Sequence, residues 1–261
     1  MQVKIFPKAT LFIIFFSIIS VRAQNSDIPL VTDRPDITES ALVVPISSLQ
    51  IENGILFEKQ SLTNSSIHNI TLSSLLLRYG LLKDLEFRFG GSYLIRKLNI
   101  NNSETSESGI SDIIIGSKIQ MLNGNISNFD LAVILQFHLP FGNESFRPAE
   151  VESDLLVAIG KSISEKFYLS GNIGINKSSS LSGYRYIYSA SIGIDLNGGW
   201  GIFTEIYGNV SSVSQATINY DAGLAYQLLK NLQFDIPIGT DSFGDYNNWF
   251  AGVGISIRIP N

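Results

Sequence analysis

The strongest constraint on the fold is an alternation of apolar and polar residues through positions 188–196. Apolar residues occupy one set of alternate positions, and polar residues such as Ser189 and Asp195 occupy the other. A period of two arises in a β-strand, because successive side chains point to opposite faces. The glycines at 198–199 can then supply the positive φ values that a tight turn needs. Residues 186–209 therefore predict a β-hairpin with one apolar face and one polar face.

The same pattern recurs along the chain after about residue 48. It is clearest in residues 85–97, where Phe87 and Phe89 alternate with Glu86 and Arg88. Many short alternating segments separated by turn-forming residues indicate an all-β fold. About twelve strands are expected, near residues 48–59, 69–79, 85–97, 110–121, 129–139, 153–160, 167–175, 186–196, 200–209, 219–226, 232–238 and 249–259.

The connections between these predicted strands alternate between long and short. Such alternation is typical of a transmembrane β-barrel, which has short periplasmic turns at one end and longer external loops at the other. An even number of strands then places both termini in the periplasm. A soluble β-sandwich, the alternative all-β fold, has no reason to sort its loops in this way. The predicted long loops are near 60–68, 98–109, 140–152, 176–185, 210–218 and 239–248, and the short turns are near 80–84, 122–128, 161–166, 197–199 and 227–231.

The composition also favours a membrane barrel. Hydrophobic residues make up 44% of the chain and charged residues only 16%, yet no long apolar run follows the first twenty or so residues. A barrel strand exposes only about half of its residues to lipid, which produces this combination. Trp200 and Tyr226 beside the short turns, and Trp249 at the other end, suit the aromatic girdles of such barrels. We therefore predict a single antiparallel transmembrane β-barrel of about 12 strands over residues 48–261.

The N-terminus has the features of an export signal. Lys4 and Lys8 precede an apolar run at 11–19 that is too short to span a bilayer, which favours a signal peptide over an anchoring helix. The small residues of Val21–Ala23 predict cleavage after Ala23, so residues 1–23 form the signal peptide. The mature chain is acidic and lacks clustered basic residues, so we expect no nucleic-acid partner.

Residues 24–47 precede the first predicted strand and contain the densest polar cluster of the chain. Asp33 and Asp36 flank Arg34 closely enough for charge-assisted hydrogen bonds, and three prolines argue against a long regular element. One interpretation is a segment that folds into the barrel lumen or caps its periplasmic mouth. The alternative is a self-bonded turn that leads into the first strand.

Polar residues of alternating strands are expected to point into the barrel. Their mixed charges would either line a path for water and solute or form a salt-bridged plug together with Asp33, Arg34 and Asp36. The inward-facing candidates are Glu52, Arg78, Glu86, Arg88, Arg96, Asp112, Lys118, Gln136, Asp195, Glu205, Asp221, Gln233 and Asp235.

The sequence offers little for catalysis or metal binding. It contains two histidines, His68 and His138, and no cysteine, which argues against a transition-metal site. A membrane-embedded lipid hydrolase would need a serine partner for His138, and the sequence does not indicate one. The acidic stretch at 150–154 does not match a calcium-binding loop and is better explained as surface charge. We therefore predict no catalytic residues, no metal and no cofactor.

Three stretches resemble a known family: LVTDRPDITESALVVPISSLQIENG, LAVILQFHLPFG, and YDAGLAYQLLKNLQFDIPIGT followed by WFAGVGISIRI. The sequence is similar over the mature chain to the outer-membrane transporter-like family known as the MetA pathway of phenol degradation, in its Bacteroidetes-type form. This resemblance implies an outer-membrane barrel with a transport role and implies no catalytic residues. The chain departs from a common barrel ending, because it finishes with Pro260 and Asn261 rather than with an aromatic residue.

The leading hypothesis is an outer-membrane barrel, in contact with lipid, that lets small solutes pass, with hydrophobic or aromatic molecules as candidates. The alternatives are an occluded barrel that acts through its external loops, the lipid hydrolase, and a soluble secreted β-protein. The sequence leaves the solute and the oligomeric state open.

Overall fold

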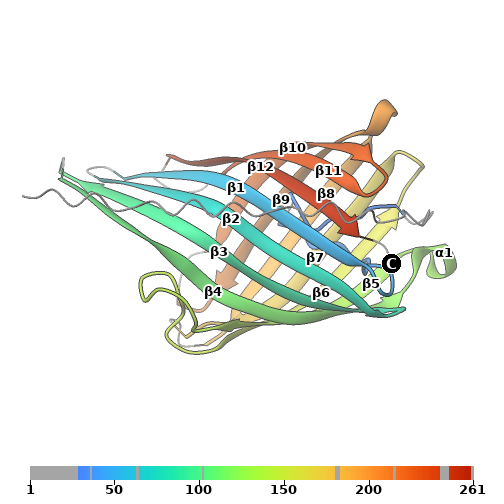
Figure 1. The fold of residues 1–261 in the computed structure, drawn as a ribbon, viewed down its shortest axis with the longest axis horizontal. Coiled ribbons are helices and arrows are strands. Elements are labelled where there is room, and N and C mark those ends of the chain that lie inside the picture. Colours follow the sequence, from blue (N-terminus) through green and yellow to red (C-terminus); the bar gives the residue numbers. More distant parts are fainter. Residues whose placement is uncertain are drawn as a thin grey trace, which may run out of the picture.

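Twelve strands close into a single barrel in the computed structural model (Figure 1). The structure describes residues 29–35, 37–62, 65–101, 103–179, 183–213, 216–241 and 247–259. The predicted signal peptide and Asp36 lie outside these residues. The strands are β1 Leu49–Leu62, β2 Ser65–Leu82, β3 Leu85–Ile100, β4 Ser103–Leu122, β5 Asp130–Leu139, β6 Glu152–Ser162, β7 Phe167–Lys177, β8 Arg185–Asp195, β9 Trp200–Ser211, β10 Thr217–Leu229, β11 Leu232–Asp241 and β12 Asn247–Ile259.

Each strand pairs antiparallel with its neighbours in sequence, and β1 pairs with β12 to close the sheet. At this closing seam Gly54 of β1 lies opposite Gly254 of β12. Two short helices, α1 (Gly124–Ser127) and the 3-10 helix η1 (Asn197–Gly199), lie in turns at one end of the barrel. Within the described part of the chain, no helix is long and apolar enough to cross a membrane. The predicted all-β antiparallel barrel of about 12 strands is confirmed.

The barrel is apolar outside and polar inside, the reverse of a soluble protein. Ile173 is 67% exposed and Ile238 60% exposed on the outer face, whereas the inward-facing Glu86 and Lys118 are fully buried. Aromatic rings pair near both rims, as Trp200 does with Tyr226 at the end that carries the short turns. Such an outer face is stable only in contact with an apolar medium.

A charge on this outer face should therefore be costly. We expect Leu135→Arg, at the middle of β5 with its side chain 40% exposed, to lower the free energy of unfolding by about 2–4 kcal/mol if it meets the hydrocarbon at mid-depth. Gln136→Arg is the matched control, because Gln136 faces inward and lies opposite Asp154 in the register. The measurement is urea unfolding of the protein refolded into lipid vesicles. Equal losses at the two positions would contradict the assignment of faces.

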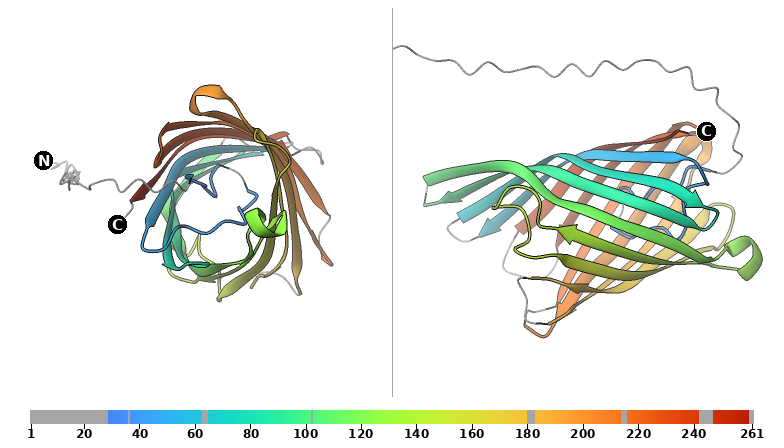
Figure 2. Two further views of the ribbon diagram at one scale, coloured as in Figure 1. Left: turned by 90° about the vertical axis from the view of Figure 1, so that its right-hand side faces the viewer. Right: turned by 60° about the horizontal axis from the view of Figure 1, so that its bottom comes forward.

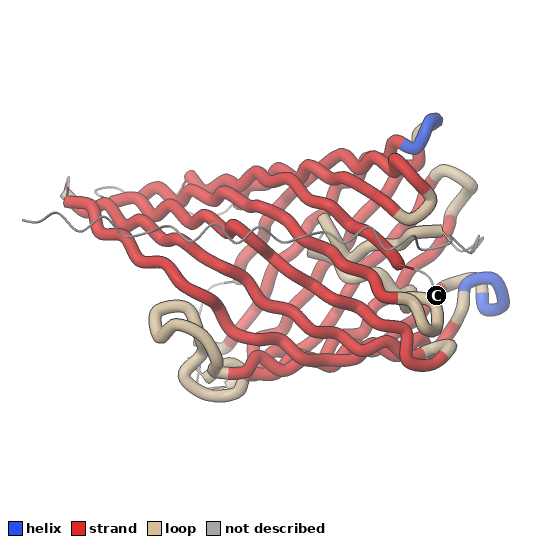
Figure 3. The backbone as a smooth tube through the Cα atoms, in the orientation of Figure 1, coloured by secondary structure: helices blue, strands red, loops and turns tan. Residues whose placement is uncertain are grey.

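Two of the predicted long loops are wrong. The regions 60–68 and 98–109 are mostly strand, and only residues 63–64 and 101–102 separate β1 from β2 and β3 from β4. The strands β1–β4 project beyond the others at the end opposite the short turns (Figure 3). In this projecting part polar residues predominate on both faces, so the alternation that identifies a strand in sequence disappears there. The predicted long loop between β5 and β6 is present as residues 140–151.

The chain before β1 runs inside the barrel. Seen from the end that carries the short turns, residues 29–47 form a loop that crosses the space enclosed by the strands (Figure 2). A bridge between Ile46 and Gly80 and a hydrogen bond from Ser47 N to Gly80 O (2.8 Å) then bring the chain to β1. We call residues 29–47 the lumenal segment. It has two arms, 29–34 and 40–45, and the strap Ile37–Glu39 between them.

Candidate functional site: the lumenal segment and its contacts

The first arm follows the wall near the closing seam. The carbonyl of Pro29 accepts a hydrogen bond from Arg258 of β12 (3.0 Å), and that of Val31 accepts one from Gln50 of β1 (2.8 Å). Further along, Glu52 of β1 accepts hydrogen bonds from the backbone N–H groups of Asp33 and Arg34 at 3.0–3.3 Å. Side chains of the wall therefore satisfy four backbone groups of this arm, in keeping with what a buried irregular segment requires.

A buried cluster of charges holds Asp33. Its carboxylate lies 3.1 Å from Arg78 of β2, 2.8 Å from Arg88 of β3 and 2.8 Å from Lys118 of β4, and all four side chains are at most 2% exposed. The wall's own anions, Glu52 and Glu86, pair with Arg78 at 3.0 and 2.9 Å. The other groups in contact with the cluster are the second arm and Glu39 of the strap.

The charges of this cluster balance only when the lumenal segment is in place. The wall contributes three cations and two carboxylates, so one buried cation would lack a counter-ion without Asp33. A buried charge without a partner costs several kcal/mol, which makes Asp33 the residue that fixes the segment in the wall. Burial by itself would raise the pKa of Asp33, but the attraction of Arg78, Lys118 and Arg88 outweighs burial and holds the pKa well below its usual value.

Glu39 of the strap differs from Asp33 in that its pKa is raised rather than lowered. It lies 2.7 Å from Arg88 and 3.6 Å from Lys118, with its side chain 18% exposed. Burial raises its pKa from 4.5 to about 7, with Asp33 adding to the rise and the two cations opposing it. Glu39 therefore binds a proton more readily with the segment inside the barrel than with the segment released.

This difference predicts a pH dependence of segment docking. The pKa of Glu39 is higher in the docked state, so docking is accompanied by proton uptake between pH 4.5 and about 7. Docking therefore becomes less favourable as pH rises through this window. Asp33 acts in a separate window, since its lowered pKa weakens docking only as pH falls below about 3.8. We expect maleimide labelling of a Ser40→Cys reporter, 8% exposed when docked, to increase between pH 5 and 7.

Thiol reactivity itself changes with pH, so the reporter needs two controls. A Ser164→Cys variant, exposed in the turn between β6 and β7, gives the rate for a free thiol at each pH. Glu39→Gln in the reporter background keeps the shape of the side chain and removes its titration, so the normalised labelling should become flat across this range. A slope unchanged by Glu39→Gln would assign the pH dependence to another group.

The strap crosses the lumen and binds the opposite wall through hydrogen bonds. Glu205 of β9 accepts hydrogen bonds from Ile37 N (2.5 Å), Thr38 N (2.9 Å) and Thr38 Oγ1 (2.5 Å). Asn172 of β7 exchanges two hydrogen bonds with the backbone of Glu39, at 2.7 and 2.9 Å. The segment thus reaches both sides of the barrel and crosses the space between them.

Arg34 fills a recess made by two glycines. Its guanidinium lies 3.1 Å from Asp235 of β11 and donates to Ser74 of β2 at 2.9 Å. A Cβ atom placed on Gly54 would lie 2.3 Å from this guanidinium, and one on Gly254 would lie 2.6 Å from Arg34 Nε. The glycine pair at the closing seam therefore allows the segment to approach the β-sheet closely.

The remaining sequence-predicted residues lie apart from this cluster. Arg96 is exposed toward the projecting end, where its guanidinium lies 5.3 Å from the centre of the Phe146 ring. Gln136 is buried on β5, and Asp195 is exposed at the end of β8 beside the lumenal segment. Asp36 lies outside the described residues. Thr38, Glu39 and Asn172 were not predicted as site residues, although the first two belong to the polar stretch TDRPDITES.

Asp112 belongs to a second polar group, nearer the projecting end. Its carboxylate lies 2.5 Å from Nδ1 of His138, and Asp154 lies 2.8 Å from Nε2 of the same ring. Asn176 of β7 also donates to Asp154 at 2.6 Å. Both ring nitrogens of His138 are thus engaged by carboxylates, which leaves neither of them in contact with a serine hydroxyl.

Solved structures share the architecture. The chain is similar to the COG4313 outer membrane channel from Pseudomonas putida F1, with 14% identity, a TM-score of 0.62, and coverage of 83% of this chain and 97% of that one. It is also similar to the translocator domain of the autotransporter NalP from Neisseria meningitidis (9% identity, TM-score 0.56, 81% and 88% covered) and to the toluene transporter TbuX from Ralstonia pickettii (8%, 0.51, 84% and 91%). At these identities the likeness establishes the fold of outer-membrane barrels. No curated protein matches the sequence.

A family comparison goes further than the fold. The sequence model of the family described as "Putative MetA-pathway of phenol degradation" matches residues 32–259, from the first arm of the lumenal segment to the last residue of β12. The match includes both the barrel wall and the strap that crosses it, which together make up most of the chain. The chain therefore belongs to this family.

Proposed function

We propose that this protein is an outer-membrane channel for small, neutral, largely apolar solutes, and that the lumenal segment closes it in the conformation described. The observation that carries the proposal is the combination of an apolar outer face with a lumen that the lumenal segment crosses. A barrel that served only as a scaffold would not need a separate segment that crosses its lumen. The predicted signal peptide at residues 1–23 is consistent with export to the outer membrane.

The solute class rests on two further observations. Ile37 of the strap is 51% exposed inside the barrel, where a purely aqueous channel would favour a polar residue. The family description refers to phenol degradation, and TbuX, which shares the fold, is a toluene transporter. Both support a small molecule with a substantial apolar surface, and a single aromatic ring meets that description.

Hydrolysis is a weaker interpretation. A serine hydrolase needs a histidine nitrogen within hydrogen-bonding reach of a serine hydroxyl. His138 instead has one carboxylate on each ring nitrogen, and His68 lies against the ring of Phe57 at 6.0 Å between centroids. We therefore propose a non-enzymatic role.

The test is conductance of the refolded mature protein in planar bilayers containing potassium chloride, together with uptake of phenol into proteoliposomes. We expect low conductance in the complete protein and a large increase on deletion of residues 24–45. Heat-modifiable migration on gels checks that the deleted barrel still folds. Phenol uptake no faster than in protein-free liposomes, in a folded barrel without the segment, would refute the proposal.

The second candidate is an occluded barrel that acts through its exterior. The projecting strands β1–β4 and the loop at 140–151 favour it, because they extend the protein at the end opposite the short turns. A folded deletion variant that neither conducts ions nor admits phenol would leave this as the better explanation.

A further inference from the structure

We propose that solute passes along the wall formed by β7–β10, and that the channel opens when the strap leaves Glu205 while both arms of the lumenal segment stay in place. This inference rests on the proposed channel function and specifies its path and its gate. It follows from a difference between the two sides of the segment in bonding, in closeness of approach and in the free space beside it.

The first arm is held by buried ion pairs, whereas among the described residues no ion pair joins the strap to β9. The ion pair that the strap does make, from Glu39 to Arg88 at 2.7 Å, lies next to the second arm and faces the same wall as the arms. Asp33 contacts three cations of β2–β4 at 2.8–3.1 Å, and the second arm adds hydrogen bonds from Lys118 to Ser40 O (2.9 Å) and from Val44 N to Glu86 (2.8 Å). Glu205 has only hydrogen bonds, and among the described residues no cation lies within ion-pair distance of it. Hydrogen bonds that water can replace cost less to break than a buried ion pair. The contacts of the strap with Glu205 are therefore the first to break.

The first arm touches the wall at the closing seam and stands off β8 and β9 near the short turns. On the seam side, a Cβ atom on Gly54 would lie 2.3 Å from Arg34. On the opposite side, Cβ atoms on Gly193 of β8 and Gly201 of β9 would have no neighbour closer than 3.9 and 3.7 Å. Side chains added at Gly193 and Gly201 would thus meet open space, and a side chain added at Gly54 would meet the segment.

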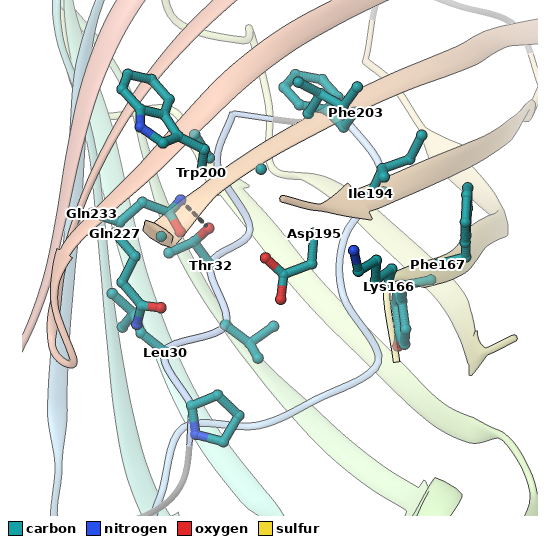
Figure 4. Close-up of a pocket in the computed structure, with 18 of the residues that line it drawn as sticks. Leu30, Thr32, Lys166, Phe167, Ile194, Asp195, Trp200, Phe203, Gln227 and Gln233 are labelled. Carbon is teal, nitrogen blue, oxygen red and sulfur yellow. Dashed lines mark hydrogen bonds between the residues drawn. The ribbon is translucent and has the colours of Figure 1, made fainter. Parts of the chain in front are cut away.

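The open space is a cavity of about 440 Å³ between the first arm and the strands β7–β11 (Figure 4). Its inward-facing wall includes small residues, Gly193, Gly201 and Ala225, and the largely buried ring of Phe203. Residues of the turns between β6 and β7 and between β8 and β9 also line it, which places its opening at the end with the short turns. Glu205, which holds the strap, lies two residues beyond Phe203 on the same strand face.

The lining selects the class of solute. Leu30, Pro35 and Phe203 offer apolar contacts, while Gln227 and Gln233 offer amide groups. The charged lining residues are two carboxylates, Asp195 and Glu165, and two cations, Lys166 and Arg34, so neither sign of solute is favoured there. The volume lies within the range of small-molecule sites. A neutral molecule with one apolar face and one hydrogen-bonding group fits this chamber best.

The first experiment breaks and then locks the strap. Glu205→Ala removes the acceptor for three hydrogen bonds and should raise potassium chloride conductance at least about tenfold over the complete protein. Thr38 Oγ1 and Ser189 Oγ lie 2.9 Å apart, and the chain has no cysteine of its own. A Thr38→Cys/Ser189→Cys pair in the Glu205→Ala background should therefore restore low conductance when oxidised and release it again on reduction. Each single cysteine variant should not respond to reduction.

The second experiment blocks the path. Ala225→Trp places a large ring on the inward face of β10, in the cavity, and should return the Glu205→Ala protein to within about twofold of the low wild-type conductance. Ala222→Trp is the matched control, because it adds the same bulk to the lipid-facing side of the same strand. We expect Ala222→Trp to leave the conductance of Glu205→Ala unchanged.

The outcomes separate this inference from the channel function itself. If Glu205→Ala raises the conductance but neither Ala225→Trp nor the oxidised cysteine pair lowers it again, the path lies elsewhere and the inference is overturned. If Glu205→Ala does not raise the conductance but deletion of residues 24–45 does, the whole segment must leave for the channel to open, which also overturns the inference. Silence in both, with folded barrels, would instead refute the proposed channel.

Discussion

Asp33→Asn should release the lumenal segment from the barrel, at a cost to docking of roughly 3–5 kcal/mol. The substitution keeps the size of the side chain but removes the charge that Arg78, Arg88 and Lys118 share at 2.8–3.1 Å. These cations are at most 1% exposed, so water cannot replace the lost carboxylate while the segment stays in place. Undocking lets water reach them and is the cheapest response available to the protein.

The readout is maleimide labelling of the Ser40→Cys reporter at constant pH, where Asp33→Asn should increase the rate by two orders of magnitude or more. Asp195→Asn is the matched control, since it makes the same chemical change at an exposed carboxylate. Adding Lys118→Met to Asp33→Asn removes one of the uncompensated cations and should recover part of the protection. Labelling of Asp33→Asn at the wild-type rate would show that Asp33 is not what fixes the segment.

The strands were predictable because each of their faces has one kind of neighbour. The alternation in 188–196 and 85–97 reflects lipid on one side and the polar interior on the other, and the structure has β8 at Arg185–Asp195 and β3 beginning at Leu85. The prediction failed at residues 98–109, where β3 and β4 continue past the apolar band and polar residues predominate on both faces. The alternation of apolar and polar residues reflects the different surroundings of the two strand faces. It therefore ends where both faces have the same surroundings.

The contacts of the lumenal segment were harder to predict. The sequence identified Asp33 and Arg34 as a polar cluster and placed Arg78, Arg88 and Lys118 on inward faces, but it left open whether the cluster bonds to itself or to the wall. Both kinds of bond occur, since Ser40 N donates to Asp33 within the segment at 3.0 Å while Lys118, 85 residues away, also binds Asp33. Pairings at such separations depend on the closed barrel and carry no local signal in the sequence.

Gly54→Val should have the second largest effect, because it fills the recess that Arg34 occupies. The new Cβ would fall 2.3 Å from the guanidinium, so Arg34 must leave Asp235, whose side chain is fully buried. Overpacking and a buried carboxylate without its partner together should cost docking about 2–5 kcal/mol. Gly193→Val is the matched control on β8, where a Cβ would have no neighbour closer than 3.9 Å.

The double variant Gly54→Val/Arg34→Ala tests how Gly54→Val acts. If Gly54→Val acts by expelling Arg34, then it should add little once Arg34 has been replaced by Ala, and the two effects on reporter labelling should be strongly non-additive. If Gly54→Val instead disturbs the pairing of β1 with β12, its cost should persist in full beside Arg34→Ala and should also appear in the unfolding of the whole barrel. Measuring labelling and urea unfolding for the four proteins of this cycle shows whether Gly54 is needed for the segment to dock or for β1 to pair with β12.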